Sequence, residues 1–132
     1  VRTLESLYYI GCHIAKSEPF PVFEVSQWEA YENNGCELSP RKSIETIIKY
    51  MRDNKLDFIV AKTQIMIVPG FKFRIVNKLI TNFHQPRSTL LLLVSAFVGD
   101  DNRRKIYDFA LGHNFRFLSY GDSSLLTNNS TQ

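Results

Sequence analysis

The sequence has little of what marks a membrane-spanning, metal-binding or disulfide-rich protein. Its 132 residues contain only two cysteines, Cys12 and Cys36, which are too few and too far apart to suggest a disulfide framework or a metal knuckle. Free thiols in a reducing cytoplasm are therefore expected. The apolar run Leu90–Val98 is about half the length that crosses a bilayer, and no signal peptide is visible. We therefore predict a cytoplasmic protein without a membrane span.

Charge of one sign is also scarce. The formal net charge of +3 permits a nucleic-acid partner but lacks the strongly basic footprint that would indicate one. The tight basic cluster at 103–105 is more often a solvated helix face than a phosphate grip. With 44% hydrophobic and 22% charged residues, the chain has ordinary globular composition and is long enough for one domain with a single core.

Hydrophobic periodicity predicts helices at four places. The first begins at once, behind a Val1 that is not methionine, so we expect a piece of a longer protein, cut at or near a helix. Asn33-Asn34-Gly35 indicates a turn, and Ser39-Pro40 is typical of a helix start. A core helix is predicted over 89–98, ending at Gly99, and another from Asp100 to 112.

Strand patterns fill most of the remainder. Phe71, Phe73 and Ile75 alternate with Lys72, Arg74 and Val76, roughly as in a half-buried strand. Residues 77–78 resemble a hairpin turn, and 79–83 would be the return strand. A further strand is predicted over 115–120, and the polar tail 127–132 is expected to be disordered. The predicted fold class is therefore α/β, with a mixed sheet that contains an antiparallel hairpin and is flanked by helices.

The candidate functional residues begin where the predicted strand 79–83 turns into the apolar helix. Asn82 and His84 precede the turn, and Arg87, Ser88 and Thr89 lie at the start of the helix. Ser and Thr are good N-cap residues, and a helix N-terminus favours an anion. This arrangement predicts an anion cradle with a histidine beside it. The alternative is that these polar groups only satisfy the turn, with Arg87 paired to a surface acid.

A second polar cluster, Tyr120-Gly121-Asp122, follows the predicted strand 115–120. A tyrosine, a tight glycine turn and a carboxylate in this position suit a ribose hydroxyl or a cationic amine. Asp122 could instead form an Asx-turn. Arg2 and Glu5 lie one helical turn apart, and without further information they would be interpreted as a helix ion pair.

Three segments, in this order, resemble the C-terminal part of the S-adenosylmethionine:tRNA ribosyltransferase-isomerase family of queuosine biosynthesis. They are VRTLES at Val1–Ser6, IVPGFKFRIVNKLITNFHQPRSTLLLLVSAFVG at Ile67–Gly99 and FRFLSYGDSSLL at Phe115–Leu126. With the helix between the second and the third, they cover about half the chain. The resemblance implies a C-terminal part of the catalytic α/β domain over 1–126, within a larger two-domain enzyme whose β-barrel domain would lie before Val1.

The chain also departs from the family pattern. Gln85 stands where a leucine is usual, Arg87 where a lysine is usual, and the turn at 77–78 lacks glycine. Ser123-Ser124 replaces a more apolar pair, and segment 13–62 is longer than the usual link and is expected to be a family-atypical insertion. These departures suggest a divergent branch.

The resemblance implies an enzyme of tRNA modification. The ribosyl part of S-adenosylmethionine would move to a 7-aminomethyl-7-deazaguanine base in a tRNA anticodon, and its rearrangement would give epoxyqueuosine, with adenine and methionine released. The donor is a consumed co-substrate, so no cofactor and no metal are expected. Partners would be the tRNA anticodon region, S-adenosylmethionine and the missing N-terminal part of the same chain.

The resemblance also implies roles for individual residues. His84 is the candidate base or orienter at the sulfonium, with Asp122 as a second catalytic residue, although His84 could merely cap the turn at 85–86. The anion set would hold a carboxylate or a tRNA phosphate. Asn82 could read a base edge or bond to the backbone.

Substrate binding is further expected of Arg2, Glu5, Tyr120 and Gly121, and base stacking of Tyr120 or Phe83. Other phenylalanines are interpreted as core: 71, 73, 97, 109 and 117. Two rival functions remain open at this stage: a non-catalytic RNA-binding module, and a related enzyme that uses the same donor on another acceptor. The isolated piece is expected to be inactive.

Overall fold

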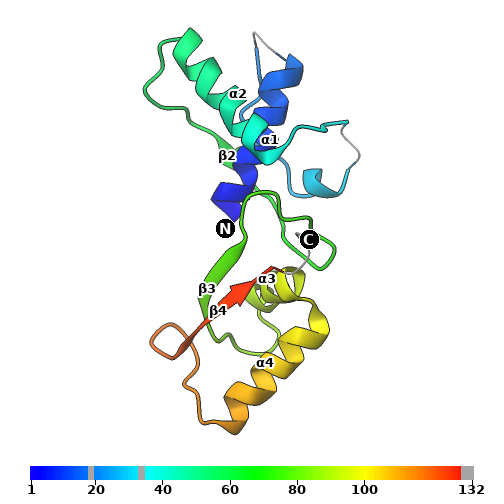
Figure 1. The fold of residues 1–132 in the computed structure, drawn as a ribbon, viewed down its shortest axis with the longest axis vertical. Coiled ribbons are helices and arrows are strands. Elements are labelled where there is room, and N and C mark those ends of the chain that lie inside the picture. The colour runs from blue at the N-terminus through cyan, green and yellow to red at the C-terminus, as the bar shows by residue number, and fades with distance from the viewer. Residues whose placement is uncertain (18–19, 33–34, 129–132) are drawn as a thin grey trace. The chain divides into compact units, whose positions relative to one another are not determined.

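The computed structural model describes residues 1–17, 20–32 and 35–128. The predicted mixture of helices and strands, with an antiparallel strand pair, is confirmed (Figure 1). Instead of the one domain with a single core expected from its length, the chain divides into two compact units, Val1–Met66 and Ile67–Gln132. None of the described helices is long and apolar enough to cross a membrane.

Two helices build the first unit, α1 (Arg2–Ser17) and α2 (Pro40–Asp53). The sequence signal for α2 is confirmed, because the Ser39 side chain accepts a hydrogen bond from the Lys42 backbone N–H at 3.1 Å. Gly11 lets the helices approach closely, and the Ser43 hydroxyl donates to the Tyr8 carbonyl at 2.6 Å. The helix pair is therefore held by close backbone approach as well as by apolar burial.

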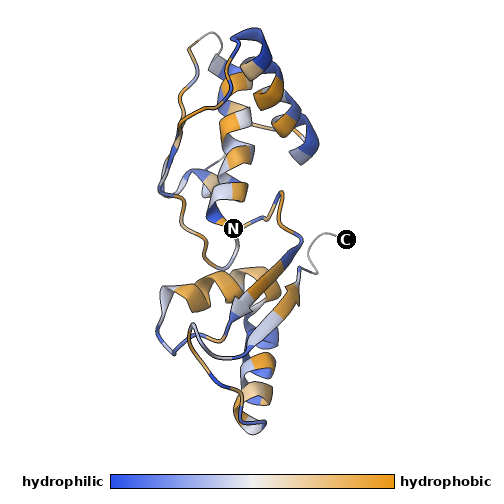
Figure 2. Ribbon diagram, turned by 90° about the vertical axis from the view of Figure 1, so that its left-hand side faces the viewer, coloured by the Kyte–Doolittle hydropathy of each residue, from blue (hydrophilic) through white to orange (hydrophobic). Residues whose placement is uncertain are grey.

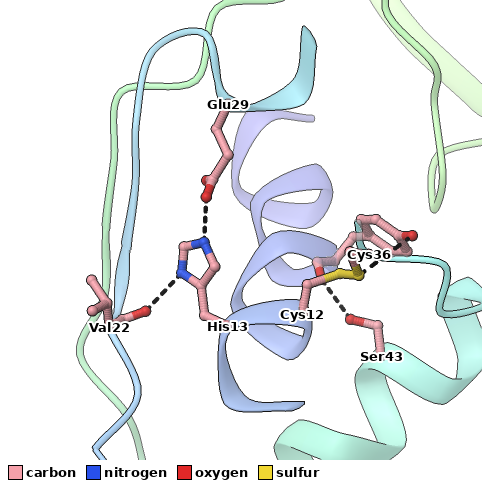
Figure 3. Close-up of polar contacts among 7 residues, drawn as sticks. Cys12, His13, Val22, Glu29, Cys36 and Ser43 are labelled. Atoms are coloured by element: carbon pink, nitrogen blue, oxygen red, sulfur yellow. Dashed lines mark hydrogen bonds and ion pairs between the residues drawn. A yellow bond between two sulfur atoms is a disulfide. The ribbon is translucent and has the colours of Figure 1, made fainter. Parts of the chain in front are cut away.

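The prediction of free thiols is wrong, because Cys12 and Cys36 form a disulfide (Figure 3). Cys12 lies on α1 and Cys36 precedes α2, so helix packing brings their Cα atoms to 5.9 Å, within the range for a disulfide. Sequence spacing carries no information on that distance. Beside the bridge, His13 contacts the Val22 carbonyl at 2.8 Å and is hydrogen-bonded to the Glu29 carboxylate.

The extended segments of the first unit are short. β1 (Glu24–Val25) pairs in parallel with β2 (Lys62–Thr63), and the 3-10 helix η1 (Glu29–Tyr31) follows β1. The turn predicted at 33–35 falls largely outside the described residues. The apolar side chains buried in this unit are Tyr8, Tyr9, Ile10, Cys12, Ile14, Val25, Ile47 and Ile65.

In the second unit the antiparallel pair joins β3 (Lys78–Asn82) to β4 (Ser123–Thr127), not to residues 71–76. The expected local hairpin is therefore wrong. Asn77, predicted to turn the chain, instead accepts a backbone hydrogen bond from Asn128 at 3.1 Å and extends the ladder. The predicted strand 115–120 is a loop, and the packed chain continues two residues beyond the predicted end at 126. Residues 129–132 of the predicted tail lie outside the described part.

The helices of the second unit agree with the sequence. α3 (Thr89–Val98) has the predicted bounds, and α4 (Asp100–Gly112) follows it directly. Figure 2 shows α3 as hydrophobic along most of its length and α4 as mixed. Phe109, predicted to face inward, is 56% exposed and stacks on His113. The apolar residues buried in this unit are Ile67, Phe71, Phe73, Val76, Leu79, Phe83, Val94, Phe97, Ala110 and Leu126.

Candidate functional site

The candidate site lies in the second unit, where the end of β3 meets the loop before β4. Asn82 is opposite Ser123 in the strand register. The loop 115–122, drawn in orange in Figure 1, therefore ends beside Asn82. Strand pairing thus brings together the two clusters that the sequence analysis treated separately.

Asn82 ties the strand to that loop. Its side-chain amide donates hydrogen bonds to the Gly121 carbonyl at 3.4 Å and to the Asp122 carbonyl at 3.3 Å. The sequence left open whether Asn82 reads a base edge or bonds to the backbone. Its side-chain amide nitrogen bonds to the backbone. Asn82 therefore positions the second cluster against the first.

His84 is held on two sides. Its Nε2 lies 2.8 Å from the Thr81 hydroxyl, and its backbone N–H donates to the Tyr107 hydroxyl at 3.0 Å. The ring is thus oriented by Thr81 on β3. The alternative expected from the sequence was that the imidazole caps the turn at 85–86, and this contact differs from that alternative. The Thr81 hydroxyl is also 3.3 Å from the Asn82 carbonyl.

The proton arrangement at His84 follows from these contacts. If the Thr81 hydroxyl donates to the Asn82 carbonyl, Nε2 must carry the proton and Nδ1 becomes the basic nitrogen. Partial burial lowers the pKa of His84 from its ordinary value of 6.5, because desolvation disfavours the imidazolium. His84 is therefore neutral at pH 7, the protonation state that a general base requires.

The Asp122 carboxylate closes its own loop. Oδ2 accepts the Arg116 backbone N–H at 2.7 Å, while the Asp122 N–H donates to the Arg116 carbonyl at 2.7 Å. The partner lies six residues upstream, so the contact is a loop closure and not the Asx-turn considered from the sequence. Gly121 is required beside it, because an added Cβ would lie 2.3 Å from the Arg116 carbonyl oxygen.

The start of α3 is capped as predicted. The Ser88 hydroxyl accepts the Leu90 backbone N–H at 3.2 Å, and Thr89 is the first helical residue. Arg87 is exposed with a φ of 64°. Among the ion pairs formed by described residues, none involves Arg87. The N-terminus thus carries an uncompensated positive side chain, in keeping with the predicted anion set.

The two candidates for base stacking have opposite environments. Phe83 is 3% exposed and packs edge-on against Tyr107 and Phe115, so its predicted stacking on a base is wrong and the residue belongs to the core. Tyr120 is 101% exposed. Of the pair, only Tyr120 presents a ring to solvent.

Arg2 and Glu5 belong to the first unit. Arg2 is exposed in the first turn of α1, whereas Glu5 is fully buried. Their predicted part in substrate binding stays a prediction, and the burial of Glu5 leaves only Arg2 exposed for a direct contact.

Sequence reasoning missed three supporting residues. Thr81 had a local signal, because it lies three positions before His84. Tyr107 on α4 had none, since its contact with His84 depends on how α4 packs against the end of β3. Arg116 had none, since its contact with Asp122 depends on the conformation of the loop between them. The basic cluster on α4 behaves as a helix face, because Arg103 and Arg104 bond Asp100 at 3.0 Å and 3.2 Å. No group of three potential metal ligands occurs in the described ranges.

The candidate site lies within a segment of the chain that matches a known protein family. A family model described as a queuosine biosynthesis protein matches residues 39–126, which include the whole candidate site and much of the segment predicted as an insertion. The chain therefore belongs to the queuosine biosynthesis protein family.

Curated relatives in this family are named S-adenosylmethionine:tRNA ribosyltransferase-isomerase. The protein from Aromatoleum aromaticum is 49% identical over 76 residues, 58% of this chain and 22% of the relative. The protein from Cereibacter sphaeroides is 57% identical over 65 residues, 49% of this chain and 19% of the relative. The chain thus spans about a fifth of the length of these relatives.

A solved structure is also similar in sequence. The S-adenosylmethionine tRNA ribosyltransferase of Thermotoga maritima is 42% identical and aligns with 61% of this chain and 30% of its own, at a TM-score of 0.49.

Proposed function

We propose that this chain serves the transfer and isomerisation of the ribosyl moiety of S-adenosylmethionine onto 7-aminomethyl-7-deazaguanine in tRNA. The product is epoxyqueuosine, and adenine and methionine are released. S-adenosylmethionine is consumed as a co-substrate, with no separate cofactor, and the tRNA anticodon region is the second partner. The reaction takes place in the cytoplasm. The acceptor distinguishes this proposal from a related enzyme that uses the same donor.

The single observation that carries the proposal is the position of the family match. It spans residues 39–126, and every hydrogen bond that builds the candidate site lies within that range. Relatives that share about half of the aligned residues bear the name of this activity. The proposal is further supported by a neutral, oriented histidine next to a helix N-terminus.

His84 is the proposed general base. Proton abstraction next to the sulfonium needs an unprotonated acceptor held in a fixed direction. Desolvation keeps the pKa of His84 below its ordinary value, and the Thr81 hydroxyl fixes the ring. Asp122, with one carboxylate oxygen on the Arg116 N–H, is the proposed second catalytic residue and contacts the ribose hydroxyls or the aminomethyl group.

The anion set is proposed to anchor the methionine carboxylate. Arg87 supplies a full positive charge and Thr89 lies at the positive end of α3. The Ser88 hydroxyl is engaged by the Leu90 N–H, so its role in the set is to fix the helix start. Asn82 holds the second cluster in place, and the exposed Arg2 on α1 is proposed to contact substrate. Glu5 is buried and is assigned no direct contact with substrate.

The experiment that tests the function is adenine release from S-adenosylmethionine by the natural polypeptide that carries residues 1–132. It is run with tRNA containing the aminomethyl-deazaguanine base, with the same tRNA containing guanine, and without tRNA. Release that requires the modified base is expected. Donor binding without release would point to another acceptor, and tRNA binding with no donor binding would point to an RNA-binding module. Either result would reject the proposal.

A further inference from the structure

The loop between α4 and β4 is held unusually firmly for an exposed segment. Arg116 and Asp122 exchange two hydrogen bonds at 2.7 Å, through the backbone and the Asp122 carboxylate. Within the loop, the Gly121 N–H donates to the Leu118 carbonyl at 2.9 Å, and the Leu118 N–H donates to the Phe83 carbonyl at 2.8 Å. These contacts fix the loop internally and fasten it to the end of β3.

The conformation held in this way is costly. Leu118 has a φ of 72°, a left-handed conformation that is rare for a branched residue. Gly121 has no room for a side chain, because a Cβ would lie 2.3 Å from the Arg116 carbonyl oxygen. Strained backbone persists only where the surroundings determine it, and it is concentrated at ligand clamps and active sites. The loop geometry therefore points to a functional demand at its tip.

What the loop presents is an aromatic ring. Tyr120 is 101% exposed, next to a Leu118 that is 50% exposed. In the part of the chain that the structure describes, no ring pairing or hydrogen bond of the Tyr120 side chain is recorded. Exposing a large apolar ring forgoes favourable burial. A stiff loop that keeps such a ring in water leaves its face available to a partner.

We propose that Tyr120 is a stacking platform for a nucleobase of the RNA substrate; this inference rests on the proposed function. Bases that are unstacked in single-stranded loops are recognised by stacking on aromatic side chains, and any base has a face that suits the ring. A small donor molecule would instead need a concave pocket that buries most of its surface, which a fully exposed ring does not offer. Tyr120 is therefore assigned to RNA and not to the adenine of S-adenosylmethionine.

The positive charge of Arg116 in the loop that carries Tyr120 suits the negatively charged backbone of RNA. Arg116 in the same loop is exposed. Its two contacts with Asp122 involve the backbone N–H and carbonyl of Arg116 and leave the guanidinium available. A positively charged surface that also carries exposed aromatic rings is the usual combination in proteins that bind single-stranded nucleic acid. Through Asn82, the loop is tied to the strand that carries His84. A base stacked on Tyr120 would thus be positioned relative to the proposed general base.

The test uses the natural polypeptide that carries residues 1–132 and an anticodon stem-loop RNA with 2-aminopurine in its loop. Tyr120→Ala, Tyr120→Phe and Tyr120→Trp are compared with Phe58→Ala, which removes another exposed ring, 74% exposed in the first unit. Because the Tyr120 ring is fully exposed, its removal leaves the fold intact. We expect Tyr120→Ala to weaken RNA binding about tenfold or more and to abolish the fluorescence quenching that stacking causes.

The other variants and the salt dependence complete the test. Phe and Trp at position 120 should bind like the wild type, and Phe58→Ala should have no effect. Tyr120→Ala should leave the slope of affinity against salt concentration unchanged, because no phosphate contact is lost.

An equal loss of RNA affinity in Tyr120→Phe and in Tyr120→Ala would show that the hydroxyl matters, and would overturn the inference. So would an unchanged affinity in Tyr120→Ala, or a KM increase for S-adenosylmethionine in place of tRNA. Failure of the function itself is seen separately, as an absence of tRNA-dependent adenine release by the wild type.

Discussion

At the scale of single residues, the environment of His84 sets the expected pH dependence. Burial lowers the pKa of His84 below 6.5, so the neutral imidazole predominates at pH 7. If His84 is the base, kcat/KM for adenine release should be constant around neutrality. It should then fall about tenfold per pH unit once the pH drops below the lowered pKa. The midpoint of that acid limb should lie below pH 6.5.

The comparison for this prediction is a pair of histidine variants. His84→Gln should remove the limb together with most of the activity, whereas His113→Gln, at the exposed end of α4, should keep both. A limb that persists in residual activity of His84→Gln would assign the titration to another group. Folding should respond with the same sign: below pH 6.5 the unfolded chain takes up a proton that folded His84 resists, so stability falls as the pH drops toward the lowered pKa.

How far the sequence predicts the site depends on the range of each contact. Asn82, His84 and Ser88 were found because their signals are local: a strand end, a turn and a helix cap. The engagement of Asn82 with Gly121 was not predictable, because it depends on β3 pairing with a strand about forty residues away. That of His84 with Tyr107 was not predictable either, because it depends on the packing of α4. Local patterns thus identify candidate side chains, whereas long-range pairing decides what those side chains contact.

At the scale of secondary-structure elements, Ser88 permits a test that separates capping from anion binding. Ser88→Ala should destabilise the second unit by about 1 kcal/mol, because the Leu90 N–H loses its acceptor. Ser88→Asp keeps an equally good cap and suits the helix dipole, so stability should be retained. A carboxylate there would nevertheless repel a bound anion, and the KM for S-adenosylmethionine should rise.

The matched control is Ser39→Asp, which makes the same change at the N-cap of α2. It should alter neither stability nor KM. If Ser88→Asp left the KM for S-adenosylmethionine and that for tRNA unchanged, the helix start would be a cap and nothing more.

Close packing between α1 and α2 gives a second prediction at this scale. A Cβ at Gly11 would lie 2.0 Å from the Ser43 Oγ and 2.5 Å from the Ser43 carbonyl oxygen. Gly11→Ala should therefore push the helices apart and destabilise the first unit by about 1–3 kcal/mol. Gly112→Ala, at the end of α4 with nothing within 4 Å, should be neutral or stabilising by up to about 1 kcal/mol. Urea unfolding of the two variants measures the difference.

The helices and the strand at β3 were predictable from the sequence, but the partner of β3 was not, for a physical reason. A helix is set by its own periodicity and ends, as Ser39-Pro40 and Ser88 to Gly99 illustrate. Residues 71–74 do alternate between buried and exposed side chains, whereas at 75–76 the buried residue is Val76 and not Ile75, and β4 provides the partner for β3. Alternation over 71–74 therefore indicated burial correctly but did not indicate the hydrogen-bonded partner.

At the scale of the whole molecule, the disulfide distinguishes the two units. The bridge between Cys12 and Cys36 spans 24 positions, and closing a loop of that size stabilises a protein by about 3–4 kcal/mol in the chain-entropy treatment. The second unit contains no cysteine. Reduction should therefore accelerate hydrogen exchange in α1, residues 20–32 and α2, and leave residues 67–128 unchanged.

Hydrogen exchange by mass spectrometry, with and without dithiothreitol, checks this division. The double variant Cys12→Ser/Cys36→Ser should exchange at the rate of the reduced wild type, and its exchange rate should not change when dithiothreitol is added. Equal acceleration in both units would mean that they unfold as one, against the division into two units. The reducing cytoplasm that we propose for the reaction favours the thiols, and a buried thiol at Cys12 still packs as a small apolar group. Adenine release should therefore survive reduction, because every contact of the candidate site described in the second unit lies beyond the bridge.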